Sequence, residues 1–246
     1  MKNVLVRRFA VVVVCLLGSV GSATAYGDAL TGMPRELEIK YALSALPPHL
    51  RAGAGVYLFD PAKGYVAAQK GTNGFSCFVA RTEYSREHFG NNVFVPVGYD
   101  SEGSKSYMRV YFDVARLRIE GKLRPEELKQ LVQKRLADGT YKSPARPGAA
   151  YMVAPIMTGY AGPGSKEVIT MSMPHLMFYA PNMTPADFGS GPPRGTYPYI
   201  LDPGPLGYMI VNIGQAEKAN IVKESQTLLN ELCAFRAELC ISLTQH

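Results

Sequence analysis

Residues 55–81 read GVYLFDPAKGYVAAQKGTNGFSCFVAR. Apolar residues dominate three short stretches of this segment, at 55–60, 65–70 and 75–81. The first two stretches are separated by a tetrapeptide with proline first and glycine last, which is typical of a turn. The second gap contains Asn73-Gly74, a strong signal for a hairpin. We therefore predict three strands that form an antiparallel meander.

The rest of the chain predicts an α+β fold. Helical spacing of apolar residues begins at Pro34, and further helices are expected at 104–120, at 125–138 and, as an amphipathic C-terminal helix, at 215–243. Strand-like stretches occur at 93–99, 149–154, 167–173, 175–180 and 208–214, and the segment 189–207, rich in proline and glycine, is expected to be a loop. Because strands and helices are segregated along the chain, we expect a mainly antiparallel sheet with helices packed on it. Residues 26–246 are expected to form a single globular α+β domain.

Residues 1–25 have the three parts of a signal peptide. Lys2, Arg7 and Arg8 supply a positive start, residues 9–17 are an uninterrupted apolar run, and Ala23-Thr24-Ala25 forms an A-x-A cleavage site. The apolar run is about half as long as the roughly 20 residues that a membrane-spanning helix needs. We therefore expect cleavage after Ala25, export to the periplasm or the extracellular space, and a soluble mature protein without membrane contact.

The charge balance argues against a nucleic-acid partner. The chain has 26 Lys and Arg against 20 Asp and Glu, and loss of the signal peptide removes three of the cations, which leaves a formal net charge of +3. The densest cations, at 116–135, alternate with glutamates, as on an ordinary solvated helix. A nucleic-acid-binding surface would require an unbalanced basic patch interleaved with aromatic residues.

No motif in the sequence identifies a reaction. Phosphate-binding loops, dinucleotide fingerprints, zinc-protease and C-x-x-C motifs and the G-x-S-x-G nucleophile elbow do not occur in the sequence. The four histidines are scattered singly. The sequence therefore implies no cofactor, and the leading hypothesis is a protein that binds a small ligand or a protein partner without catalysis.

Three cysteines remain after signal cleavage, Cys77, Cys233 and Cys240. On a continuous helix, the Cα atoms of Cys233 and Cys240 would lie about 10 Å apart, beyond the limit of about 7 Å for a disulfide. An oxidising compartment favours disulfide formation. We therefore expect Cys77 to be joined to one cysteine of the C-terminal helix, with three buried thiols as the alternative.

Two carboxylates, Asp100 and Glu102, stand between a predicted strand and a predicted helix. Carboxylates at such a position serve either as acid–base groups or as caps that satisfy the free N–H groups of the helix. Capping is the simpler interpretation. If the protein is an enzyme, we expect a hydrolase-type reaction that uses His175 with Asp100 or Glu102.

Met171, Met173 and His175 recur at alternate positions, so a continuous strand would place all three on one face. Thioether sulfurs and an imidazole are ligands that suit Cu(I). Periplasmic copper handling through these residues is therefore a third hypothesis. The simpler interpretation is that the methionines fill gaps in the core.

His175, Tyr179, Asn182 and Asp187 follow one another at the end of a predicted strand and in the loop after it. Loops of this kind gather binding groups, so these four residues form the candidate ligand-binding set. The competing interpretation is a buried, hydrogen-bonded histidine followed by a short helix that Thr184 and Asp187 cap.

The signal peptide yields a testable prediction. The mature protein is expected to begin at Tyr26, because small residues at 23 and 25 fit the cleavage site. Intact-mass measurement of the protein recovered outside the cytoplasm tests this. A mass that still includes residues 1–25 would contradict it.

Overall fold

The computed structural model describes residues 29–83, 91–161, 165–189 and 197–241. The predicted signal peptide and part of the predicted loop 189–207 lie outside these ranges. Within them, a sheet of eight strands has the order β2-β1-β3-β4-β5-β8-β10-β9. Its strands are β1 (Gly55–Asp60), β2 (Gly64–Gln69), β3 (Ser76–Ala80), β4 (Val95–Tyr99), β5 (Ala149–Met152), β8 (His175–Tyr179), β9 (Tyr199–Leu201) and β10 (Tyr208–Asn212). A two-stranded sheet pairs β6 (Met157–Tyr160) with β7 (Val168–Met171).

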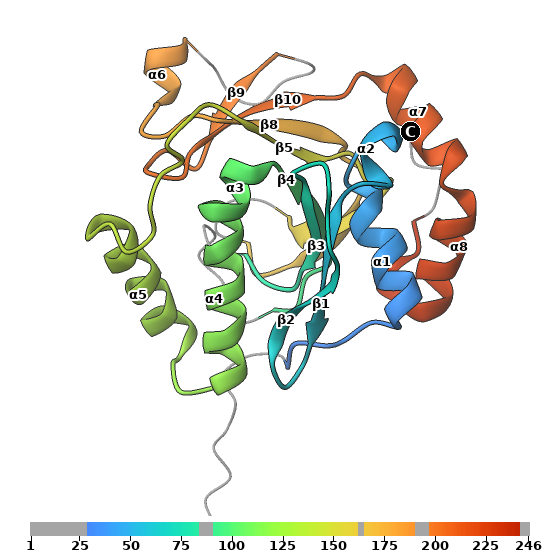
Figure 1. Cartoon of the computed structure of the whole chain (residues 1–246), viewed down its shortest axis with the longest axis horizontal. Coiled ribbons are helices and arrows are strands. Elements are labelled where there is room, and N and C mark those ends of the chain that lie inside the picture. The colour runs from blue at the N-terminus through green and yellow to red at the C-terminus, as the bar shows by residue number, and fades with distance from the viewer. Residues whose placement is uncertain (1–28, 84–90, 162–164, 190–196, 242–246) are drawn as a thin grey trace, which may run out of the picture.

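Helices cover both faces of the large sheet (Figure 1). One side carries α1 (Arg35–Ser44), α2 (Pro48–Arg51), α7 (Gln215–Glu224) and α8 (Gln226–Phe235), and the other carries α3 (Ser101–Lys105), α4 (Tyr107–Glu120) and α5 (Pro125–Ala137). The short α6 (Pro185–Phe188) lies beside β9. Apart from β1 with β3, the strand pairs described in the large sheet are antiparallel, so the predicted α+β fold is confirmed. No helix in the described ranges has both the length and the apolar character needed to cross a lipid bilayer.

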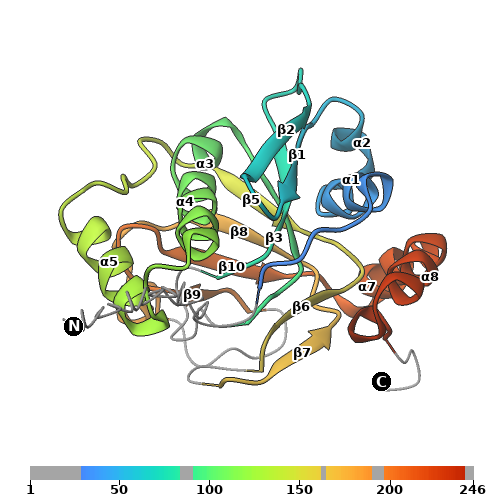
Figure 2. The ribbon, with the colours of Figure 1, turned by 90° about the horizontal axis from the view of Figure 1, so that it is seen from below.

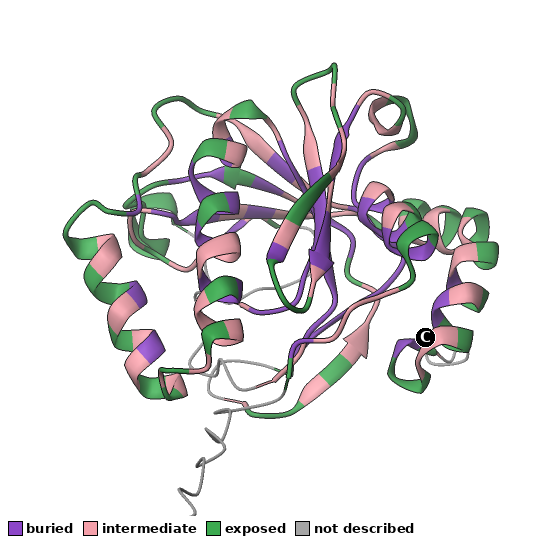
Figure 3. Cartoon of the chain, turned by 60° about the horizontal axis from the view of Figure 1, so that its bottom comes forward, coloured by how far each residue is buried: buried purple, intermediate pink, exposed green. Residues whose placement is uncertain are grey.

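Alternation along the central strands explains why both faces bear helices. In β3, Cys77 and Val79 are buried in the cluster under α1 and α8, whereas Phe78 and Ala80 are buried in the cluster under α4 and α5. Successive side chains of a strand point to opposite faces, so a strand that is apolar at successive positions must be covered on both sides. Figure 3 shows buried residues concentrated in the sheet and on the helix faces turned toward it.

The predicted meander is wrong in one connection. β1 pairs with β2 antiparallel, but β3 lies on the other side of β1 and runs parallel to it. The chain between β2 and β3 crosses the start of β1, where the N–H of Gly55 donates to the carbonyl of Phe75 (2.8 Å). A Cβ at Gly71 would overlap the backbone of Gly55, so the crossing requires glycine there. Asn73-Gly74 therefore turns the chain around the start of β1 and not back along β2.

The predicted helices at 104–120 and 125–138 correspond to α4 and α5, with α3 as a separate turn ahead of α4. Gly121 ends α4 in the left-handed conformation (φ 63°), as the sequence indicates. The strands β6 and β9 were not predicted, and β9 lies within the segment expected to be a loop. The local pattern therefore located the long helices and most of the strands but missed β6 and β9.

The C-terminal segment predicted as one helix at 215–243 is interrupted. It consists of α7, α8 and a 3-10 turn at Ala237–Leu239, with a break at Ser225 and another at Arg236, whose backbone is extended (φ −149°). The second break brings the Cα atoms of Cys233 and Cys240 to 4.3 Å, and these two residues form a disulfide. The predicted bridge from Cys77 is therefore wrong, and the Cys77 thiol is free and buried beneath α1.

The β6–β7 sheet lies below the large sheet and approaches the C-terminal segment (Figure 2). The hydroxyl of Thr170 in β7 donates to the carbonyl of Glu238 in the 3-10 turn. The residue before β4, Phe94, forms a backbone bridge with Thr158 of β6. The C-terminal turn and the start of β4 therefore hold this small sheet in place.

A buried ion pair joins α1 to the end of β3. Arg81 Nη2 lies 2.8 Å from Glu38 Oε1, and the two side chains are 0% and 1% exposed. Arg81 Nε also donates to the carbonyl of Thr31 (2.9 Å), and the guanidinium lies 4.7 Å from the centre of the Phe94 ring. Glu38 Oε1 accepts the N–H of Phe59 in β1 (3.1 Å). The pair therefore ties α1, β1, β3 and the N-terminal segment together at one point.

Glu38→Ala is expected to lower the free energy of unfolding by about 3–5 kcal/mol, because it leaves the Arg81 cation buried without a counter-charge. Lys40→Ala is the matched control on the same helix, since Lys40 pairs with Glu231 at 2.8 Å but the two side chains are 53% and 36% exposed. Loss of such an exposed pair costs about 1 kcal/mol or less. Urea unfolding followed by circular dichroism measures the free energy of unfolding of both variants. Equal losses in the two variants would contradict the importance of the buried pair.

The cysteine arrangement predicts a definite thiol count. In protein that begins at Tyr26, a thiol reagent should detect no cysteine in the native state, one after denaturation without reductant, and three after reduction. Burial raises the pKa of the Cys77 thiol to about 12, so the native thiol is both enclosed and protonated. Non-reducing peptide mapping that linked Cys77 to either partner would contradict the structure.

Candidate functional site

Asp100 caps the N-terminus of α3. Its Oδ1 accepts the backbone N–H groups of Glu102 (2.9 Å) and Gly103 (2.8 Å). The same oxygen accepts the hydroxyl of Tyr179 (2.8 Å), and Oδ2 accepts the N–H of Ala149 (2.9 Å). A carboxylate has about four acceptor positions, so these donors occupy it. The capping interpretation of Asp100 is confirmed.

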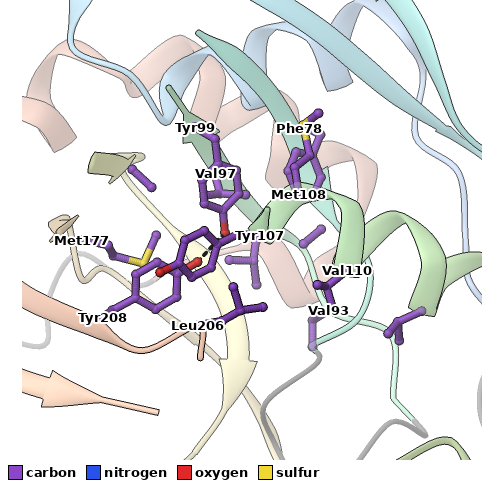
Figure 4. Packing of buried hydrophobic residues seen from close by; sticks show 14 of the residues in the cluster. Phe78, Val93, Val97, Tyr99, Tyr107, Met108, Val110, Met177, Leu206 and Tyr208 are labelled. Carbon is purple, nitrogen blue, oxygen red and sulfur yellow. Dashed lines mark hydrogen bonds between the residues drawn. The ribbon is translucent and has the colours of Figure 1, made fainter. Parts of the chain in front are cut away.

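Tyr179 is the other predicted site residue that the structure brings to this point. Its ring lies 4.7 Å from that of Tyr107, which stacks on both Tyr99 and Tyr208 (Figure 4). Burial raises the pKa of Tyr179, and the charge of Asp100 raises it further. Tyr179 is therefore a protonated donor in the core, and its bond to Asp100 joins β8 to the start of α3.

His175 lies in the core, 3% exposed, at the opposite end of β8 from Tyr179. Its Nδ1 lies 2.7 Å from the carbonyl of Met173, and burial lowers the pKa of the ring, which favours its neutral form. Four residues of strand place about 13 Å between His175 and the end of β8 that meets Asp100. The structure therefore does not bring His175 together with Asp100 or Glu102, as the hydrolase hypothesis requires.

The premise of the copper hypothesis, a continuous strand through Met171, Met173 and His175, is wrong. Met171 ends β7 in the two-stranded sheet, whereas His175 begins β8 in the large sheet. Met173 lies between the two strands and is 38% exposed. These residues therefore do not share one strand face. Among the described residues there is also no group of three or more His, Cys, Asp or Glu side chains suited to a metal ion.

Asn182 and Asp187 are exposed in the turn after β8, beyond its Tyr179 end and away from His175. Asn182 has a φ of 61°, and its N–H donates to the carbonyl of Gly204 (2.7 Å). Asp187 Oδ2 accepts the N–H (3.0 Å) and the hydroxyl (2.7 Å) of Thr184. The predicted cap of this short helix is therefore confirmed, and both residues shape the turn.

A cleft of about 860 Å³ lies between the β1–β2 turn, α3, α4 and the chain that follows α5. Its volume falls within the range of about 300–1,000 Å³ that is typical of small-molecule sites. The charged residues that line it are the cations Lys63, Lys105, Arg109, Arg116, Arg135 and Lys142 and the carboxylates Glu102 and Asp113. The cleft is therefore large enough for a small ligand, and its charge favours an anion.

Asp113 joins the two helices that flank the cleft. Its carboxylate pairs with Arg116 of α4 (2.7 Å) and with Arg135 of α5, and it accepts the hydroxyl of Tyr141. Burial alone would raise the pKa of Asp113, but hydrogen bonds from Tyr141 and Arg116 and the charge of Arg135 hold it below its usual value. Asp113 is therefore ionised and pairs with both arginines, and Arg116 also pairs with Glu120.

Three other cations of the cleft have no counter-charge. The side chains of Lys105, Arg109 and Lys142 are exposed and, within the part of the chain that the structure describes, form neither a hydrogen bond nor an ion pair. Glu102, which precedes Lys105 by one helical turn, already accepts the N–H of Ala145 (2.9 Å) and pairs with Arg146 (3.6 Å). The cleft therefore carries uncompensated positive charge.

Aromatic rings also line the cleft. Phe112 and Tyr65 stack with ring centres 4.4 Å apart and an interplanar angle of 15°. The Tyr57 ring makes a T-shaped contact with Phe112, with centres 5.2 Å apart and an interplanar angle of 65°. Because Phe112 follows Arg109 by three residues, the two lie on neighbouring positions of one face of α4. The cleft thus offers an aromatic surface within one helical turn of Arg109.

One sequence signal for this site was missed. Lys105, Arg109 and Arg116 recur at intervals of four and seven residues, which is the spacing of one helical face. The cations at 116–135 alternate with glutamates, and this pattern predicted only an ordinary solvated surface. Lys63 and Lys142 lie in connections far apart in the sequence, and only the tertiary structure places them beside α4.

Comparison with known proteins gave no match: none of the family models, curated proteins or solved structures that were searched matches this chain. A fold by itself does not define a function, because unrelated functions occur on similar folds. The chemistry of the cleft is therefore the basis for inferring the function.

Proposed function

We propose that the protein is exported to the periplasm or the extracellular space and binds a small anionic ligand in the cleft beside α4, without catalysis. The observation that carries this proposal is the uncompensated charge of Lys105, Arg109 and Lys142 in a concave site. Export is supported by the charge and hydropathy pattern of residues 1–25.

Cations that line a cleft attract an anion more strongly than cations on an open surface. At about 4 Å, two opposite unit charges attract by about 1 kcal/mol in water but by about 4 kcal/mol at the effective dielectric constant near a protein surface. Arg109 adds a planar fork of donors that matches a carboxylate or a phosphate. Because no carboxylate of the described chain holds these three side chains, a ligand need not displace one in order to bind.

The two acidic groups of the cleft favour binding over catalysis. Glu102 is joined to the chain after α5, and Asp113 is held by two arginines and Tyr141. A general base needs a free carboxylate within reach of the substrate proton, and both of these are committed to joining structural elements. The concave shape favours a small molecule over a protein partner, whose interface would cover a broader surface.

Arg109→Gln is expected to weaken anion binding at least about tenfold, because it removes a charge-assisted pair of hydrogen bonds. Isothermal titration calorimetry of the mature protein with inorganic phosphate, sulfate and citrate measures the affinity. Binding by the wild type should also weaken as NaCl increases, because salt screens an exposed ionic contact. Arg109 is exposed, so the melting temperature should change little.

Lys223→Gln is the matched control. Lys223 is an exposed cation of α7, on the opposite side of the sheet from α4 (Figure 1), so its loss changes the net charge equally but leaves the cleft intact. Its affinity for the three anions should equal that of the wild type. Equal losses in the two variants would show that only the net charge matters, and a wild type that binds none of the anions would overturn the proposal.

A further inference from the structure

The charge of the cleft exceeds what a single carboxylate neutralises. Lys105, Arg109 and Lys142 contribute three positive charges, whereas Arg116 and Arg135 are already paired with the carboxylates of Asp113 and Glu120. A carboxylate carries one negative charge, but a phosphomonoester carries about −1.5 to −2 near neutral pH and presents three acceptor oxygens. A dianionic head group therefore matches the three free donors better than a monoanion does.

The ring system beside the cations is suited to a planar group. Phe112 stacks on Tyr65 and makes edge contacts with Tyr57 and Phe78, so the wall of the cleft is the margin of a larger aromatic cluster. A ring placed against this margin gains aromatic contacts, and the guanidinium of Arg109 can pack on its face. A saturated ring of the same size would gain only the hydrophobic part of this interaction.

The spacing of the two features fits one small molecule. Arg109 and Phe112 are three residues apart on α4, which corresponds to about 4.5 Å along the helix axis. Because the two side chains leave the helix on one face, Arg109 is within reach of a phosphoryl group that is esterified directly to a ring packed against Phe112. No long linker is therefore needed for a ligand to reach both.

We infer that the ligand of the cleft is an aromatic phosphomonoester. Its dianionic phosphoryl group binds Lys105, Arg109 and Lys142, and its ring packs against Phe112 and Tyr65. This inference rests on the proposed anion-binding function and deepens it by naming both halves of the ligand.

Calorimetric titration of the mature chain with four probes tests the inference. The probes are inorganic phosphate, phenyl phosphate, cyclohexyl phosphate and benzoate. Phenyl phosphate is expected to bind at least about tenfold more tightly than inorganic phosphate or benzoate, and severalfold more tightly than cyclohexyl phosphate. These comparisons use the wild-type protein alone, so they do not depend on whether a variant folds.

Phe112→Leu separates the two halves of the ligand. Leucine keeps an apolar side chain in the wall but removes the ring, so phenyl phosphate should lose its advantage over cyclohexyl phosphate. The affinity for inorganic phosphate should stay at the wild-type value, because the three cations are unchanged. Circular dichroism and a thermal melt establish that the variant is folded before it is titrated.

Each outcome has a defined consequence. Equal affinities for phenyl phosphate and inorganic phosphate would overturn the aromatic part of the inference. If Arg109→Gln then weakened the binding of both phosphates, the proposed anion-binding function would stand. Benzoate that bound as tightly as phenyl phosphate would overturn the dianionic half. A wild type that bound none of the probes would overturn the inference together with the proposed function.

Discussion

Arg81 and Glu38 carry opposite charges in a part of the interior that solvent does not reach. Burial raises the pKa of Glu38 and lowers that of Arg81, so each charge persists there only because the other is beside it. The pair fixes α1 against the end of β3, and the hydrogen bond from Phe59 fixes β1 at the same point. Displacement of any of these elements would isolate a charge in apolar surroundings. The position of α1 on the sheet is therefore set by electrostatics as well as by packing.

On the opposite face of the sheet, buried polar and aromatic groups fix the positions of α3 and α4, which line the cleft. Asp100, which accepts hydrogen bonds from Tyr179 and from backbone N–H groups, defines where α3 begins. Tyr107 packs the start of α4 against Tyr179 and Tyr208. Lys105 and Arg109 project from the segment that these buried groups position. Exposed cations on a rigid base lose little conformational freedom of the backbone when a ligand binds, which favours a preformed site.

Local sequence patterns were sufficient where the cause of a structure is itself local. Gly121 ends α4, Asp100 and Thr184 cap short helices, and an apolar stretch at 75–81 identified β3. The predictions were wrong where the structure depends on contacts between residues that are far apart in the sequence. The path from β2 to β3 depends on the close approach of the Gly71 backbone to the Gly55 backbone. The disulfide depends on a break in the helix at Arg236, which the helical spacing of apolar residues does not reveal. Three separate segments of the chain form the cleft. Its charged residues can be identified in the sequence, but their proximity cannot.

The cluster beneath α1 is built from segments that are far apart in the sequence. Leu37 and Tyr41 come from its first described helix, while Leu229, Leu232 and Leu239 come from its last described turns. Contacts between residues so far apart in sequence form later than local ones, and they need the chain to have been made as far as residue 239. A polypeptide that is still emerging from a ribosome or a translocation pore therefore leaves this side of α1 and β3 uncovered. Its apolar surface is open to chaperones until residues 229–239 have been released and have packed against it.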